Sequence, residues 1–389
     1  MAPTIDLPEA GGVLTPYTMQ ATPIDAPVPP APFNRVAFAA AHVVADPLTS
    51  AEPSGPAILD WEATLAFRRH LLDLGLGIAE AMDTSQRGMG LDWPTAEELI
   101  ARSLDAATAE ERGRIFSGVG TDQLEPEPTL TLDDIIAAYL TQLHAVQRRG
   151  GRVILMASRA LARVATGPDD YAHVYARVLA EADAPVILHW LGEMFDPALA
   201  GYWGHADVDA AEATLLALIG AHAAKIDGVK ISLLDAAREV RVRAALPDGV
   251  RMYTGDDFNY PALIKGDGER ASDALLGIFD PIAPAASVAL SALAAGDEAR
   301  FDAVLAPTVP LSRTIFRAPT RFYKTGIVFL AWLNGFQDHF VMVGGAQAMR
   351  PLPYFAEVFR QADQAGLLRS PDLAAARMRR LLALYGVGA

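Results

Sequence analysis

The sequence predicts an α/β fold, a (β/α)8 TIM barrel with a C-terminal helical extension. Eight strand-like segments alternate with helix-like segments, a pattern that implies βαβ crossovers and a parallel sheet. The strand-like segments are nearly continuous apolar runs, as strands covered on both faces should be. No GxGxxG motif follows the first strand, which disfavours an open dinucleotide-binding sheet. Eight such units in succession favour a closed barrel.

The predicted strands are short and recur at regular intervals. They cover residues 35–45, 77–82, 114–120, 152–158, 184–192, 226–232, 250–257 and 272–279. The intervening helices cover residues 60–75, 95–107, 131–151, 169–183, 207–224, 235–245, 260–268 and 283–296. Gly75 is a natural stop for the first helix. Thr95, with Glu98 three residues later, forms a capping-box pattern and predicts that the second helix starts there.

Composition divides the chain into three predicted regions. Residues 1–34 contain many prolines and cannot form a helix, so we expect an N-terminal arm, with a short strand or hairpin in residues 11–20. Residues 35–296 form the barrel. Residues 297–389 carry helical patterns only and form the C-terminal helical region.

The overall charge limits the partners of the protein. The chain has 389 residues, of which 51% are hydrophobic and 20% are charged, with a formal net charge of −15. An acidic surface repels nucleic acid and anionic membranes, so we expect neither as a partner. The chain has no cysteine, which excludes disulfides, thiol nucleophiles and cysteine metal ligands.

No targeting or membrane segment is recognisable. The first residues, "MAPTIDLPEAGG", have neither a basic start nor an apolar run, unlike a secretory signal. The longest apolar stretch, "TGIVFLAWLNG", is well short of the ~20 residues that span a bilayer. We therefore expect a cytoplasmic protein.

The segment "GVKIS" places a lysine inside a predicted strand. Side chains alternate along a strand, so Gly228, Lys230 and Ser232 share the face that points into the barrel. Burial lowers the pKa of a lysine, and the neutral amine is a nucleophile toward carbonyl groups. The alternative is a lysine that pairs with a carboxylate such as Asp256 and has no covalent role.

Several motifs together resemble a known family. "IFSGVGT", "APVILHW", "GVKIS", "TGDD" and "LLGIFDPIAP" occur in the order of its barrel strands, and "YKTGIVFLAWLNG" and "RPLPYF" resemble its C-terminal helices. Over residues 35–365 the chain is similar to the dihydrodipicolinate synthase / N-acetylneuraminate lyase family of class I aldolases. The resemblance implies that Lys230 forms a Schiff base with a keto acid or keto sugar. It also implies cleavage or formation of a C–C or C–O bond, no cofactor, a small carbonyl substrate, and a homodimer or homotetramer.

The sequence departs from this family at two places. The family tyrosine that relays protons in the fifth strand is replaced by His189, a competent proton shuttle; the alternative is a buried histidine bonded to backbone. The family loop that holds the substrate carboxylate is replaced by "MDTSQRGMG". Thr84 and Ser85 of this loop are predicted to orient the substrate. The departures indicate a divergent subfamily, and the polar barrel mouth favours carbohydrate or sugar-acid catabolism.

Further substrate contacts are predicted at the ends of other strands. Thr254, Gly255 and Asp256 follow the seventh strand and would line the far wall of the site. His42 follows the first strand and would bind a substrate oxygen, or else be structural. Asp256 and Asp257 adjoin, so one is expected to cap the next helix while the other faces the barrel mouth.

Two other functions remain open at this stage. A metal-dependent barrel aldolase or isomerase would bind a divalent ion through His189, Glu193 and His205, with Asp196 nearby. In that case Lys230 would act only through its charge. The other alternative is a non-catalytic barrel that binds a metabolite.

Overall fold

The computed structural model describes residues 2–9, 11–49, 52, 55–125 and 129–387. The chain divides into two compact units, which are described in turn. The barrel unit comprises residues 35–41 and 77–277. The helical unit comprises residues 1–34, 42–76 and 278–389.

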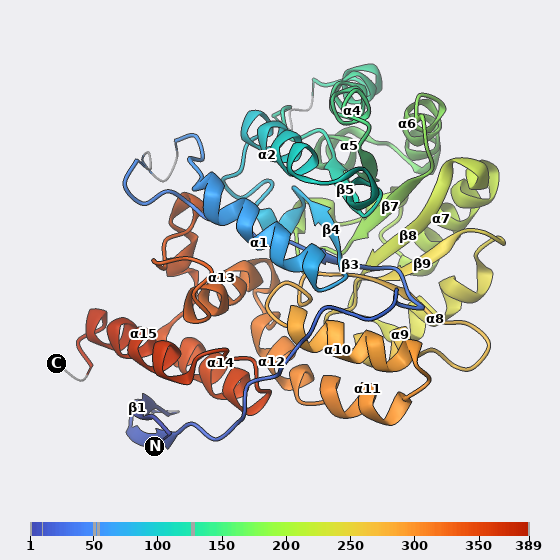
Figure 1. The fold of residues 1–389 in the computed structure, drawn as a ribbon. Coiled ribbons are helices and arrows are strands. Elements are labelled where there is room, and N and C mark those ends of the chain that lie inside the picture. Colours follow the sequence, from blue (N-terminus) through green and yellow to red (C-terminus); the bar gives the residue numbers. More distant parts are fainter. Residues whose placement is uncertain (1, 10, 50–51, 53–54, 126–128, 388–389) are drawn as a thin grey trace. The chain divides into compact units, whose positions relative to one another are not determined.

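The barrel unit is built on a closed sheet of eight strands (Figure 1). Each strand pairs in parallel with the next along the chain, and the last closes on the first through Ala274 and Ala37. The predicted (β/α)8 fold is thereby confirmed. The strands are β3 (Ala37–Ala40), β4 (Gly77–Glu80), β5 (Ile115–Val119), β6 (Arg152–Leu155), β7 (Val186–Leu191), β8 (Ile226–Ser232), β9 (Arg251–Thr254) and β10 (Asp273–Leu276).

Helices of the same unit pack on the outside of the strands. α2 contacts β4, α4 contacts β5 and β6, and α8 contacts β9. The helices are α2 (Trp93–Ala106), α3 (Ala109–Arg112), α4 (Leu132–Gln147), α5 (Arg159–Val164), α6 (Pro168–Ala180), α7 (Val208–His222), α8 (Ala236–Ala245) and α9 (Tyr260–Lys265). Four 3-10 turns join them: η1 (Asp83–Ser85), η2 (Pro197–Leu199), η3 (Tyr202–Gly204) and η4 (Ala223–Lys225).

The predicted start of α2 was wrong by two residues. The N-cap is Asp92, whose carboxylate accepts a 3.0 Å hydrogen bond from the Thr95 amide. Pro94 is tolerated because it lies in the first turn, where its missing N–H has no partner to lose. An aspartate cap therefore takes the place of the predicted Thr95 capping box.

The interior of the barrel is filled by side chains. The rings of Phe38 and Phe116 lie 5.0 Å apart, and those of Phe38 and Tyr253 lie 5.9 Å apart. Gly228 makes room for this cluster, because a Cβ at that position would lie 2.6 Å from the Tyr253 ring. The lumen is therefore packed beneath the ends of the strands and opens only above this layer.

The helical unit contains the N-terminal hairpin and most of the C-terminal helices. Strands β1 (Thr4–Pro8) and β2 (Leu14–Thr18) pair antiparallel, which confirms the strand predicted in residues 11–20. The Tyr17 hydroxyl donates a 2.7 Å hydrogen bond to Asp363, and the Gln20 amide donates to the same carboxylate at 2.9 Å. The helices are α1 (Trp61–Asp73), α10 (Ala283–Ala294), α11 (Glu298–Leu305), α12 (Thr308–Ile315), α13 (Tyr323–Leu333), α14 (Leu352–Gln364) and α15 (Pro371–Leu384), with the 3-10 turns η5 (Thr320–Phe322) and η6 (Val343–Met349).

Within the described ranges, no helix has both the length and the apolar character needed to cross a bilayer.

A carboxyl group is buried between α8 and the barrel. The side chain of Glu239 is 1% exposed and accepts a 2.8 Å hydrogen bond from the Ser272 hydroxyl. Burial raises the pKa of Glu239 to about 7, although hydrogen bonds from Ser272 and Thr254 act in the opposite direction. At pH values between its two pKa values, Glu239 is therefore protonated in the folded protein and ionised in the unfolded chain.

We expect Glu239→Gln to change how stability depends on pH. Between pH 4.5 and about 7 the folded wild type binds one proton more than the unfolded chain, so its stability falls as pH rises. Glutamine does not ionise, so the variant should gain about 2–4 kcal/mol relative to wild type across this window. Urea unfolding at several pH values measures this, with the exposed Glu98→Gln as control. Parallel stability curves for wild type and Glu239→Gln would contradict the prediction.

Candidate active site

Lys230 and His189 lie side by side at the carboxyl ends of neighbouring strands. The two residues are direct partners in the register of β7 and β8. Ile187 belongs to the core inside the barrel, so His189, two residues further along β7, points into the lumen as well. Lys230 is 7% exposed and His189 is 1% exposed. The two residues that the sequence predicts to be catalytic therefore lie next to each other in the barrel.

Burial controls the charge of both groups. It lowers the pKa of Lys230 below its ordinary value of 10.5, and the nearby carboxylates of Asp83 and Asp257 only partly oppose this shift. Burial, reinforced by the charge of Lys230, also holds the pKa of His189 well below its usual range. The imidazole is therefore neutral at neutral pH. The Lys230 amine, which loses its proton easily, therefore lies beside the His189 ring, which can both donate and accept a proton.

Polar groups lie on both sides of the His189 ring. Its Nε2 is 3.2 Å from the Ser232 hydroxyl, on the same face of β8 as Lys230. Its Nδ1 is buried with no hydrogen-bond partner among the described residues, and lies 4.0 Å from an Asp83 carboxylate oxygen. Asp83 begins η1, directly after β4. The ring can therefore exchange a proton with Ser232, and the Asp83 carboxylate is near enough to stabilise the imidazolium.

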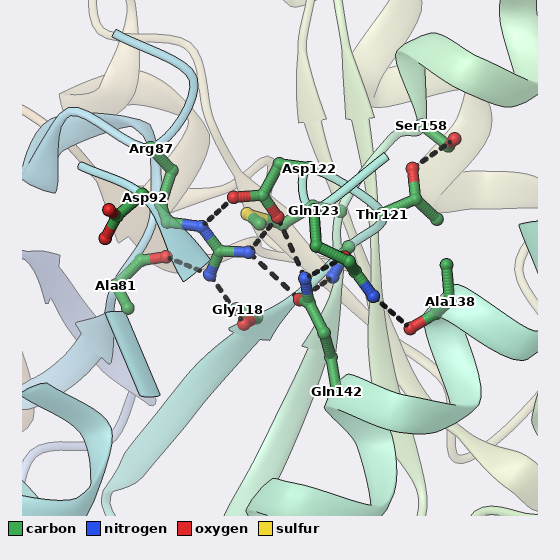
Figure 2. Close-up of polar contacts among 12 residues, drawn as sticks. Ala81, Arg87, Asp92, Gly118, Thr121, Asp122, Gln123, Ala138, Gln142 and Ser158 are labelled. Carbon is green, nitrogen blue, oxygen red and sulfur yellow. Dashed lines mark hydrogen bonds and ion pairs between the residues drawn. The ribbon is translucent and has the colours of Figure 1, made fainter. Parts of the chain in front are cut away.

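The loop after β4 is fixed by a buried arginine (Figure 2). The Arg87 guanidinium donates through Nε to Asp122 at 2.8 Å, and through Nη2 to the other oxygen of that carboxylate. Nη1 donates to the carbonyls of Ala81 and Gly118 at 3.2 and 3.1 Å, and Nη2 also donates to Gln142 at 2.9 Å. Five acceptors thus meet the five N–H groups of one guanidinium, which makes this arginine structural.

A cavity of about 300 Å³ is lined by His189, the register partner of Lys230, whereas Lys230 is not among its described lining residues. Its walls include Asp83 and His189, and its only arginines among the described lining residues are Arg87 and Arg159. Arg159 Nε donates to Asp196 at 2.5 Å, and its guanidinium lies against Gly88, where any Cβ would overlap it. The carboxylates that line the cavity are Asp83, Asp92, Asp122, Glu125 and Asp196. The cavity is therefore predominantly acidic.

The structure places the other predicted substrate contacts in different surroundings. Thr84 and Ser85 are buried in η1, and the Ser85 hydroxyl donates to the Ala41 carbonyl at 2.8 Å. Thr254 is hydrogen bonded with Glu239 of α8, so its side chain points away from the lumen. A Cβ on Gly255 would overlap Ser232 Oγ, which shows that Gly255 packs closely against the end of β8.

The two adjacent aspartates have different surroundings, but the helix cap expected of one of them is wrong, because the N-cap of α9 is Asn259 and no side chain caps it. Asp256 accepts hydrogen bonds from the amides of Phe258 and Asn259 at 2.8 and 3.0 Å, so it organises the loop before α9. The charge of Asp257, in contrast, acts on Lys230. The substrate-binding role given to Asp256 stays a prediction, as do those of Thr84, Ser85, Thr254 and Gly255.

His42 belongs to the helical unit. Its Nδ1 lies 2.8 Å from Asp280 Oδ2, and its ring centroid is 4.4 Å from that of Phe67. The ring is fully buried. These contacts account for a structural role, and its predicted contact with substrate stays a prediction.

The residues proposed as metal ligands do not form one group. Glu193 and His205 line a second cavity of about 240 Å³, whereas His189 lines the first. Asp196 pairs with Arg159. Throughout the described part of the chain, no three His, Asp or Glu side chains lie close enough together to hold a metal ion.

Sequence reasoning assigned no role to Asp83, and left Asp257 between a helix cap and the barrel mouth. Each lies three residues beyond the end of its strand, β4 or β9, and this position near the carboxyl ends of strands was the available signal. The contacts of Arg87 with Asp122 and Gln142 join residues 35 and 55 positions apart and leave no local pattern.

We expect Arg87→Lys to destabilise the protein by about 3–5 kcal/mol, because lysine cannot replace the paired bonds to Asp122 and leaves a buried carboxylate poorly compensated. Urea unfolding measures the loss. Arg102→Lys is the control, since its pair with Glu98 is exposed and should contribute less than about 1 kcal/mol. Equal stabilities of the two variants would show that the guanidinium does not hold the loop.

Known proteins match this chain in family and in fold. A family model described as "Protein of unknown function (DUF993)" matches residues 5–387. A search of curated proteins found no match.

Similar solved structures include members of the dihydrodipicolinate synthase family. The 4-hydroxy-tetrahydrodipicolinate synthase of Methylacidiphilum fumariolicum SolV has a TM-score of 0.62 at 15% identity, over 89% of this chain and 99% of that chain. The chloride-inhibited dihydrodipicolinate synthase of Acinetobacter baumannii, complexed with pyruvate, has a TM-score of 0.62 at 15% identity, over 86% and 99%. A prophage protein of this family from E. coli K12, in complex with pyruvate, has a TM-score of 0.61 at 14% identity, over 91% and 99%.

At these identities the likeness concerns the fold, and it confirms the expected barrel. The family model covers nearly the whole sequence. The chain belongs to the family described as protein of unknown function (DUF993), and it has the fold of the dihydrodipicolinate synthase family.

Proposed function

We propose that this protein is a class I aldolase-type lyase in which Lys230 forms a Schiff base with a small carbonyl substrate. The observation that carries the proposal is a buried amine of lowered pKa in the lumen, in register with a neutral histidine. Structural lysines usually keep their charge in ion pairs, whereas a nucleophilic lysine must lose its proton.

The chemistry follows from the neutral amine. Lys230 Nζ attacks the carbonyl carbon, a C–N bond forms, and the carbonyl oxygen leaves as water after taking up protons. The protonated imine then withdraws the electron pair of a neighbouring bond. In a retro-aldol step this pair comes from the Cα–Cβ bond, while the β-hydroxyl loses its proton and becomes the carbonyl of the departing fragment. In a dehydration the pair comes from a Cα–H bond, and the resulting enamine expels the protonated β-hydroxyl as water. The reverse steps form these bonds.

His189 moves the protons in this proposal. The ring contacts the Ser232 hydroxyl, which lies on the same face of β8 as Lys230. The Asp83 carboxylate stabilises the ring when it is transiently charged. Because the pKa of His189 is well below its usual range, the imidazolium is a strong acid and returns its proton readily.

The compared structures support the proposal through the fold. The dihydrodipicolinate synthases among them are lyases of the family that the motifs resemble, and two of the structures contain pyruvate. Lys230 lies in β8, the sixth strand of this barrel, where the resemblance places the Schiff-base lysine.

The cofactor requirement, pathway, compartment and oligomeric state that we propose follow from the family resemblance and from the polar barrel mouth. The iminium itself accepts the electron pair, so the proposed reaction requires no cofactor. We place the reaction in carbohydrate or sugar-acid catabolism, in the cytoplasm, with the chain as a homodimer or homotetramer. The predominantly acidic cavity described above supports a polyhydroxylated substrate.

Borohydride reduction in the presence of a carbonyl panel should attach a ligand-sized mass to Lys230, because hydride converts the imine into a stable amine. Intact mass and peptide mapping measure the adduct. Lys230→Ala should abolish it, and Lys265→Ala, in α9, is the matched control that should retain it. An adduct that survives in Lys230→Ala would remove this lysine from the mechanism.

The rate of adduct formation should depend on the pKa of Lys230. We expect the pH profile to reach half its maximum below pH 10.5, because burial favours the neutral amine. Asp83→Asn should move the midpoint further down, since the Asp83 carboxylate raises the pKa of this amine. The initial trapping rate between pH 5 and 11 gives both midpoints. An upward shift in Asp83→Asn would contradict the electrostatic role of Asp83.

A further inference from the structure

The loop after β4 uses its hydrogen-bond donors internally. The amides of Ser85, Gln86 and Arg87 donate to carbonyl oxygens of the same loop at 2.9–3.4 Å. The Ser85 hydroxyl donates to the Ala41 carbonyl. A cradle for a substrate carboxylate needs several N–H or O–H donors that point at the ligand. Four hydrogen-bond donors of this loop therefore already have acceptors within the protein.

The surroundings of Lys230 are unfavourable for a second carboxylate. In a 2-oxo acid the carboxylate is attached to the carbon that Lys230 attacks, so it would lie two covalent bonds from Nζ. The charges of Asp83 and Asp257 already act on this amine. A third negative charge in a buried site is repelled unless a cation or several donors compensate it.

Neither arginine of the cavity carries an uncompensated positive charge. All five N–H groups of Arg87 have acceptors within the protein. Arg159 is paired with Asp196. With these two pairs set aside, the charged groups that remain on the cavity wall are the carboxylates of Asp83, Asp92 and Glu125. The cavity thus presents acceptors and an excess of negative charge.

Hydroxyl groups match this lining. Each hydroxyl donates one hydrogen bond, which a carboxylate accepts strongly, and its oxygen still accepts from Arg159 or His189, which both line the cavity. The cavity of about 300 Å³ is at the small end for ligand sites. We infer that the substrate is an uncharged polyhydroxylated ketone or aldehyde, a small keto sugar rather than a 2-oxo acid. This inference rests on the Schiff base proposed above.

Two three-carbon compounds test the inference directly. Dihydroxyacetone and hydroxypyruvate both contain a hydroxymethyl ketone. On the other side of the carbonyl, dihydroxyacetone has a second hydroxymethyl group and hydroxypyruvate has a carboxylate. The rate of borohydride trapping on Lys230 is measured for each compound at equal concentration. Each rate is then divided by the trapping rate of the same compound with free Nα-acetyl-lysine, which corrects for the intrinsic reactivity of its carbonyl group. We expect the normalised rate for dihydroxyacetone to exceed that for hydroxypyruvate at least tenfold, which corresponds to about 1.4 kcal/mol of discrimination.

Charge-removing variants test the cause. Asp83→Asn should raise the normalised hydroxypyruvate rate and reduce the ratio, and Asp257→Asn should act in the same direction. Glu98→Gln removes a carboxylate from the exposed face of α2, and should leave the ratio unchanged. Circular dichroism confirms that each variant is folded before its ratio is taken.

The outcomes separate this inference from the function on which it rests. A normalised ratio below ten, with adducts on Lys230, overturns the substrate class and leaves the Schiff base in place. Adducts with neither compound overturn the Schiff-base proposal, and this inference with it. A ratio above ten that Asp83→Asn and Asp257→Asn leave unchanged overturns the electrostatic explanation.

Discussion

The removal of one amine from water is the constraint on which the site depends. Lys230 sits in a closed barrel above a packed layer that includes Tyr253 and Phe38. Water cannot reach the amine from below, so its charged form loses solvation, and the carboxylates of Asp83 and Asp257 restore only part of it. The same dry surroundings keep His189 neutral. A single property of the fold therefore sets the charge of both groups.

The Arg87 contacts fix the loop that brings a carboxylate toward Lys230. The guanidinium connects the loop after β4 to Gly118 of β5 and Gln142 of α4. Asp83, at the start of that loop, lies 4.0 Å from the His189 ring, and its charge acts on Lys230. One buried arginine therefore helps to set the charge that surrounds the lysine.

The architecture was largely predictable because its signals are local and repeated. Eight apolar runs separated by helical patterns define a barrel, and alternation along β7 and β8 places His189 and Lys230 on one face. The surroundings of these side chains were less accessible to sequence reasoning. Thr254 follows Tyr253, which faces the lumen, so the threonine faces α8 instead. The depressed pKa of His189 arises from burial by distant segments, which no local pattern encodes.

Two glycines in the barrel bear on how such a site can change over evolutionary time. Gly228 leaves space for the Tyr253 ring, and Gly255 leaves space for Ser232 Oγ. A Cβ at Gly228 would also lie 2.6 Å from the Arg251 carbonyl oxygen, and a Cβ at Gly255 would lie 2.6 Å from the Ile231 carbonyl oxygen. No smaller side chain on the neighbouring strand relieves an overlap with backbone. Both positions should therefore stay glycine while the side chains around the lysine diverge.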